Sequence, residues 1–169
     1  MHNTCKKQNY RYFQFTGFRS GGKLEKIAKN ILDHIAIAVP EIEPVLEHYS
    51  NMFDAEITPP KIISEQGIRM AYVHFENIKI ELIEPLNEHS PVAKFLERNP
   101  KGAMHHFCAV TSDAEASAKS IKNNQMRVLG EPVIGHHGQK MFFLHPSDTS
   151  NILVEIVESK KGKGTTNEN

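Results

Sequence analysis

Two histidines and two glutamates stand at matching places in a repeated sequence pattern. The string NIKIELIE recurs later in the chain as NILVEIVE, and a short apolar segment containing a histidine precedes each copy. His34 precedes Glu81 by 47 positions, and His106 precedes Glu155 by 49 positions. A repeat of this kind indicates that one structural unit occurs twice. We therefore expect two imidazoles and two carboxylates arranged about a pseudo-twofold axis.

These side chains have the chemistry of a transition-metal site. Neutral imidazoles and carboxylates suit a divalent transition ion, and positions left open on the ion can take water or substrate. Such an ion can hold a carbonyl oxygen and stabilise the negative charge that develops when a neighbouring C–H bond loses its proton. Any one of these residues alone would more often be an ordinary solvent-facing side chain. Their duplicated placement favours a metal site formed by His34, Glu81, His106 and Glu155.

Each half of the chain predicts a strand, a helix and then further strands. The first half favours a strand over 31–39, a helix over 41–53 and strands over 69–75 and 78–84, with a tight turn at Glu76-Asn77. The second half favours a strand over 105–111, a helix over 114–124 and strands over 127–129, 140–145 and 152–157. Ser90-Pro91 is typical of a helix start and opens a short connecting helix.

Strand alternation places the candidate ligands on one face. His34 points away from Ile35 and Ile37, and Glu81 and Glu155 alternate in the same way with branched apolar neighbours. We expect the apolar faces to pack on the helices and the faces with histidine and glutamate to line a concavity.

Composition is that of one globular domain. The chain has 169 residues, with 20 basic and 20 acidic side chains, so no overall field favours nucleic acid or an anionic membrane surface. No apolar run approaches the ~20 residues that span a bilayer. Two cysteines, Cys5 and Cys108, form no disulfide framework, which is typical of a reducing compartment.

The two ends of the chain differ from its centre. The first thirty residues contain seven basic side chains and one acid, Glu25, which is typical of a transit peptide but equally of a plain basic extension. The expected compartment is therefore the cytoplasm, or the mitochondrial matrix if this start is a transit peptide. We divide the chain into an extension (1–30), one domain (31–158) and a disordered tail (159–169). The domain contains module one (31–87), a linker helix (90–99) and module two (103–158).

Several motifs between Leu32 and Glu158 carry a family resemblance. They are LDHIAIAV, EQGIR, IELIEPL, SPVAKFL, GAMHH, GQK, FLHP and LVE, in chain order. This segment resembles the methylmalonyl-CoA epimerase family of the vicinal-oxygen-chelate (glyoxalase-like) superfamily. The histidine and glutamate positions would match any glyoxalase-like protein, whereas SPVAKFL and the His-Pro turn are particular to the epimerases.

The resemblance implies an α+β fold, in which two tandem βαβββ modules form a curved mixed sheet around one metal site. It implies epimerisation at C2 of methylmalonyl-CoA through a metal-stabilised enolate. His34, His106 and Glu155 fall on the family's metal positions, and Glu81 falls where members carry Gln or Glu. The implied cofactor is a divalent ion, with cobalt as the first candidate and zinc, nickel or manganese as alternatives. The implied substrate is an acyl-CoA and the implied assembly is a homodimer. No nucleic-acid or membrane partner is expected.

The catalytic bases are less well specified. Some members use a glutamate at the position of Met70, and methionine accepts no proton. We predict that Glu155 serves one face of the substrate and that Glu81 or a bound water serves the other. Two other functions fit the same fold: a lactoylglutathione lyase, and a non-catalytic module that sequesters a ligand. The sequestering module would have no need of the four ligands.

Other polar residues favour ordinary roles. His105 is out of phase with His106 on a strand and is expected to pack or hydrogen-bond. His136 and His137 lie in a glycine-flanked loop, where a mobile surface role is the default. Two further residues, Arg69 and Lys140, could meet CoA phosphates, although such side chains are usually solvated. Cys108 is expected to be a buried small hydrophobe.

Overall fold

The computed structural model of the chain describes residues 27–29 and 31–160. Module one contains β1 (Leu32–Ala38), α1 (Ile42–Met52), β2 (Glu56–Ile57), β3 (Lys61–Ile63), β4 (Ile68–His74) and β5 (Lys79–Pro85). The linker helix is α2 (Pro91–Arg98). Module two contains β6 (Ala103–Thr111), α3 (Ala114–Asn123), β7 (Val128–Ile134), β8 (Lys140–Leu144) and β9 (Leu153–Glu158). The expected transit peptide and disordered tail lie almost wholly outside the described residues.

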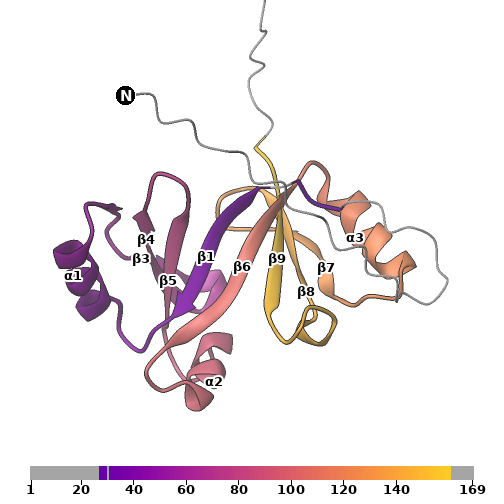
Figure 1. Cartoon of the computed structure of the whole chain (residues 1–169). Coiled ribbons are helices and arrows are strands. Elements are labelled where there is room, and N and C mark those ends of the chain that lie inside the picture. The colour runs from indigo at the N-terminus through magenta and orange to yellow at the C-terminus, as the bar shows by residue number, and fades with distance from the viewer. Residues whose placement is uncertain (1–26, 30, 161–169) are drawn as a thin grey trace, which may run out of the picture.

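The strands form one mixed sheet with matching halves. Their order is β2-β4-β5-β1-β6-β9-β8-β7, with β3 beside β4. Within each module the first and last strands pair in parallel, β1 with β5 and β6 with β9. The modules join where β1 and β6 pair antiparallel, in the middle of the molecule (Figure 1). This confirms the α+β fold with two tandem βαβββ modules.

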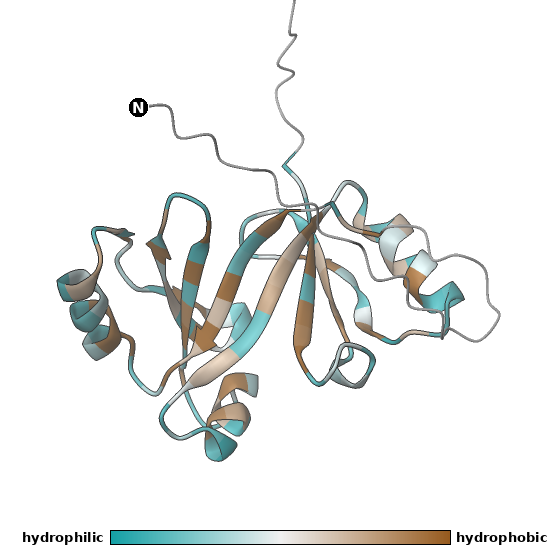
Figure 2. Ribbon diagram, in the orientation of Figure 1, coloured by the Kyte–Doolittle hydropathy of each residue, from teal (hydrophilic) through white to brown (hydrophobic). Residues whose placement is uncertain are grey.

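Helices α1 and α3 cover the apolar faces that alternation predicted. Ile42 of α1 packs with Val73 and Leu82, and Ile121 of α3 packs with Val154 and Ile156. Figure 2 shows the corresponding alternation of polar and apolar residues along the strands and on α1. Within the described part of the chain, no helix is long and apolar enough to cross a membrane.

The second glutamate of each repeated string lies on a strand and accepts a hydrogen bond from the first backbone N–H of a helix. The backbone N–H of Ile42, at the start of α1, donates to Glu84 Oε2 at 2.8 Å. The N–H of Ala114, at the start of α3, donates to Glu158 Oε2 at 3.1 Å. A carboxylate at a helix N-terminus satisfies an otherwise unpaired donor and interacts favourably with the helix dipole. The repeat therefore encodes a helix contact together with the candidate ligand three residues earlier.

Three details differ from the expectations. Strand β7 extends to Ile134, well beyond the predicted 127–129, because it pairs with β8 on both sides of an irregularity. The short strands β2 and β3 were not predicted from the sequence. Residues 27–29, assigned to the extension, contact module two, where the Lys29 N–H donates to the Val110 carbonyl at 2.7 Å.

Candidate metal centre

Two rows of cross-strand neighbours bring the four candidate ligands together. Ala36 on β1 lies opposite Glu81 on β5 and opposite His106 on β6. Cys108 on β6 lies opposite Glu155 on β9 and opposite His34 on β1. Each row thus combines a glutamate of one module with the histidine of the other. Ala36 and Cys108 are fully buried between them, and their small side chains leave room for the larger groups to meet.

Three ligand atoms form a tight cluster. His34 Nε2 and His106 Nε2 are 3.3 Å apart, and Glu155 Oε2 lies 3.0 Å from His106 Nε2 and 3.5 Å from His34 Nε2. The three ligand atoms lie within 4.8 Å of one another. Atoms that share an ion with bonds of ~2.0–2.2 Å lie at most about 4.4 Å apart. All three separations are below that limit, so the cluster fits an ion without contraction.

Glu81 lies beside this cluster. Its Oε2 atom is 3.4 Å from His34 Nε2 and 3.8 Å from His106 Nε2. The structure therefore brings all four sequence-predicted residues to one place, and each of them is buried.

A neighbouring residue on the same strand orients each histidine. His34 Nδ1 lies 2.9 Å from Asp33 Oδ1, and His106 Nδ1 lies 2.9 Å from His105 Nδ1. Burial, together with the charge of His106, lowers the pKa of His105 to about 4, so this imidazole is neutral and can accept. Each candidate ligand histidine thus donates its Nδ1 hydrogen to an acceptor, so an ion that displaces the Nε2 proton would meet the imidazole in its ligating tautomer. His105 hydrogen-bonds, as its strand phase predicted.

The local charges favour a cation at the centre. Burial alone would lower the pKa of His34, but the hydrogen bond to Asp33 and the nearby Glu155 and Glu81 raise it to about 9. Burial would likewise raise the pKa of Glu155, but hydrogen bonds from His106 and His34 lower it to about 2. The carboxylates thus stabilise positive charge where the Nε2 atoms meet. Two imidazoles and two carboxylates with this electrostatics fit a divalent transition ion.

The cluster opens into a cavity of about 950 Å³ lined by both modules. His136 and His137, from the turn between β7 and β8, line this cavity, with His136 half-buried and His137 exposed, so this surface loop also forms part of the cavity wall. His137 Nε2 lies 2.8 Å from Tyr72 Oη. Among the described residues, the buried Nε2 atom of His136 has no hydrogen-bond partner. A polar group of a ligand in the cavity could therefore pair with it.

Tyr72 is the site residue that sequence reasoning missed. Its hydroxyl donates to Glu81 Oε1 at 3.1 Å. The two residues are directly opposite in the β4–β5 ladder. A turn at Glu76-Asn77 implies this pairing, so counting outward from the predicted turn could have found it.

The remaining polar candidates have structural partners. Arg69 donates to Glu84 at 2.9 Å and also pairs with Glu43, and Lys140 pairs with Glu115 at 3.0 Å. These contacts give both side chains ordinary structural roles. Cys108 is a fully buried small side chain, and burial raises the pKa of its thiol, as expected for an inert cysteine.

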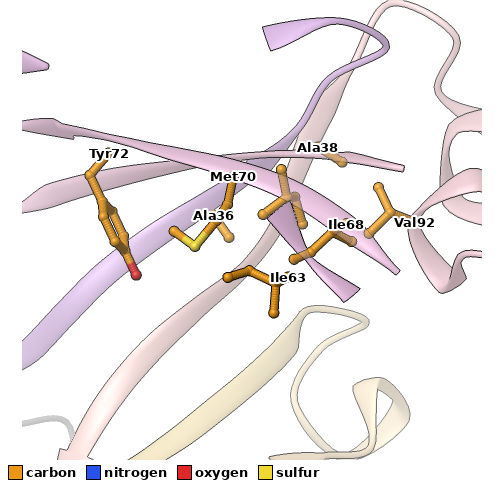
Figure 3. Close-up of a cluster of buried hydrophobic side chains, with 8 residues drawn as sticks. Ala36, Ala38, Ile63, Ile68, Met70, Tyr72 and Val92 are labelled. Atoms are coloured by element: carbon orange, nitrogen blue, oxygen red, sulfur yellow. The ribbon is translucent and has the colours of Figure 1, made fainter. Parts of the chain in front are cut away.

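Met70 belongs to the apolar core. It is 3% exposed and packs in a cluster with Ala36, Ile68 and Ile83, as Figure 3 shows for the first two. Helix α2 covers this cluster through Val92. The side chain at position 70 is therefore a packing element and not a proton carrier.

We expect Met70→Ala to cost about 2–5 kcal/mol of unfolding free energy, because it leaves a cavity in this cluster. Calorimetry should show a lower melting temperature, whereas turnover per folded, ion-loaded molecule should stay near the wild-type value. A large loss of turnover in fully folded variant would contradict the assignment of Met70 to packing.

Comparisons with known proteins agree with this geometry. The family model of the Glyoxalase/Bleomycin resistance protein/Dioxygenase superfamily matches residues 33–143. An ethylmalonyl-CoA/methylmalonyl-CoA epimerase of Cereibacter sphaeroides is 43% identical over 127 residues, which cover 74% of this chain and 95% of the relative. The human mitochondrial methylmalonyl-CoA epimerase is 38% identical, with coverage of 76% and 73%.

A solved structure is also similar. It is a variant of the Streptomyces coelicolor methylmalonyl-CoA epimerase in complex with 2-nitronate-propionyl-CoA. The TM-score is 0.71 at 33% identity, and the match covers 78% of this chain and 95% of that chain.

Proposed function

We propose that this chain, which belongs to the methylmalonyl-CoA epimerases of the Glyoxalase/Bleomycin resistance protein/Dioxygenase superfamily, interconverts the two C2 epimers of methylmalonyl-CoA. The observation that carries the proposal is the cluster of His34, His106 and Glu155, with Glu81 beside it, on the wall of a cavity of about 950 Å³. The size of this cavity is typical of a small-molecule site.

His34, His106 and Glu155 would hold a divalent ion, with Glu81 as a fourth ligand. When bound, the ion supplies positive charge that stabilises the negative charge developing on the thioester oxygen as C2 loses its proton. The residues around it hold the histidines in the ligating tautomer. Cobalt is our first candidate for the ion, with zinc, nickel or manganese as alternatives, because all four accept imidazole and carboxylate ligands.

Epimerisation needs one group that removes the C2 proton and another that returns a proton to the opposite face. We assign the first role to Glu155. Its Oε2 atom is directed at the histidines, while among the described residues no hydrogen bond reaches its Oε1 atom. Glu81 or a bound water would serve the other face.

The assembly and the compartment are further proposals. We expect a homodimer, which sedimentation would test. The human relative is mitochondrial by name. If the basic first thirty residues of this chain are a transit peptide, we expect the protein in the mitochondrial matrix, and otherwise in the cytoplasm.

The decisive experiment follows C2 deuteration. Cobalt-loaded protein is incubated in heavy water with one epimer of methylmalonyl-CoA, and NMR follows the C2 signal. We expect rapid deuteration and conversion to the other epimer, whereas the hemithioacetal of glutathione and methylglyoxal, supplied in parallel, should not be turned over. No deuteration, or turnover of the hemithioacetal alone, would overturn the proposed function.

A further inference from the structure

The two modules differ at one pair of equivalent aromatic residues. Tyr72 on β4 lies opposite Glu81, and Phe143 on β8 lies opposite Glu155. Each ring also packs edge-on against the histidine of its own module, Tyr72 at 6.3 Å from His34 and Phe143 at 5.4 Å from His106. These positions are related by the same pseudo-symmetry as the ligands. The chemical difference between them is a single hydroxyl group.

That hydroxyl donates a hydrogen bond to one carboxylate oxygen of Glu81. Tyr72 Oη donates to Oε1 at 3.1 Å, while Oε2 of the same carboxylate is the atom near the two histidines. Figure 3 shows the Tyr72 ring at one end of the apolar cluster.

His137 holds the hydroxyl from the other side. A tyrosine hydroxyl carries one hydrogen. Because that hydrogen goes to Glu81, the His137 Nε2–H group is the donor in its 2.8 Å contact with Tyr72 Oη. The two rings are also stacked, with centroids 5.8 Å apart and 23° between their planes. This contact joins the β7–β8 turn of module two to β4 of module one.

Glu155 has no such restraint. Phe143 offers it no donor, and within the described part of the chain no hydrogen bond reaches Glu155 Oε1. We infer that Tyr72, backed by His137, is a positioning residue that fixes Glu81 as an ion-holding group, and that this makes the two repeated glutamates unequal. The consequence for proton transfer rests on the proposed function, because it leaves Glu155 as the carboxylate with an oxygen available to the substrate.

The first test measures ion binding without turnover. Cobalt is titrated calorimetrically into the wild type, Tyr72→Phe, His137→Ala and the double variant, with Tyr49→Phe as the matched control on α1. We expect Tyr72→Phe to weaken cobalt binding about tenfold, as loss of a partner that orients a ligand typically does. Tyr49→Phe should bind as the wild type does. The double variant should bind no worse than Tyr72→Phe, because His137 acts through the hydroxyl.

The second test exchanges the two aromatic residues. Phe143→Tyr places a hydroxyl opposite Glu155, so we expect cobalt affinity to be retained and the rate of C2 deuteration to fall about tenfold, a part of the 10²–10⁴ that a general base contributes. Melting temperatures identify any variant that is not folded. Tyr72→Phe removes only a hydroxyl group, so we expect it to fold and to test the role of Tyr72 even if Phe143→Tyr does not fold.

Three results would overturn the inference. They are wild-type cobalt affinity in Tyr72→Phe, additive losses of affinity in the double variant, and undiminished deuteration in Phe143→Tyr. Absence of C2 deuteration in the wild type would instead refute the proposed function, while the cobalt titrations would still decide the role of Tyr72.

Discussion

His106→Ala should bind a divalent ion at least ~100-fold more weakly than the wild type and should show no measurable turnover. A residue that only orients a ligand is worth 10–100-fold in affinity, so loss of a ligand should cost at least the upper end of that range. The variant loses the Nε2 atom that lies 3.3 Å from His34 and 3.0 Å from Glu155. Calorimetric titration with cobalt and the deuteration assay measure the two effects separately.

The matched control for this variant is His48→Ala. His48 is an exposed histidine on α1, so its removal tests for general effects of losing an imidazole. Circular dichroism should show that both variants are folded. Near-normal cobalt affinity in folded His106→Ala would mean that the ion is held elsewhere.

Glu155→Gln should separate ion binding from proton transfer. The amide oxygen can still ligate, so we expect cobalt affinity to fall by about tenfold at most, on the scale of a perturbed ligand. A Gln side chain cannot accept the C2 proton, and loss of a general base typically costs 10²–10⁴ in rate. Deuteration of one epimer should therefore fall by about that factor, while deuteration of the other epimer continues. Interconversion of the epimers needs both faces and should stop.

Each epimer is assayed separately at saturating cobalt, with Glu97→Gln on α2 as an exposed control. Equal, wild-type deuteration of both epimers in fully loaded Glu155→Gln would show that Glu155 is a ligand only. Equal loss on both faces would point to a damaged site and contradict the one-face assignment.

The sequence by itself determined the module and its candidate ligands. Strand alternation reports which side chains share a face, and the repeat reports which of them are equivalent, so His34, Glu81, His106 and Glu155 could be named without coordinates. Both signals are local or periodic, so they can be recognised in a single sequence. The same locality explains how the turn at Glu76-Asn77 already implied the pairing of Tyr72 with Glu81.

Contacts between the modules were decided only by the tertiary structure. The antiparallel register of β1 and β6 places Ala36 opposite His106, and shifting it by one residue would turn one histidine to the other face of the sheet. No local pattern specifies that register. Tyr72 and His137 are 65 positions apart, and their contact depends on where the β7–β8 turn lies against module one. A glycine-flanked loop therefore looks like surface in the sequence, although packing of the modules places its histidines on the wall of the cavity beside the candidate metal centre.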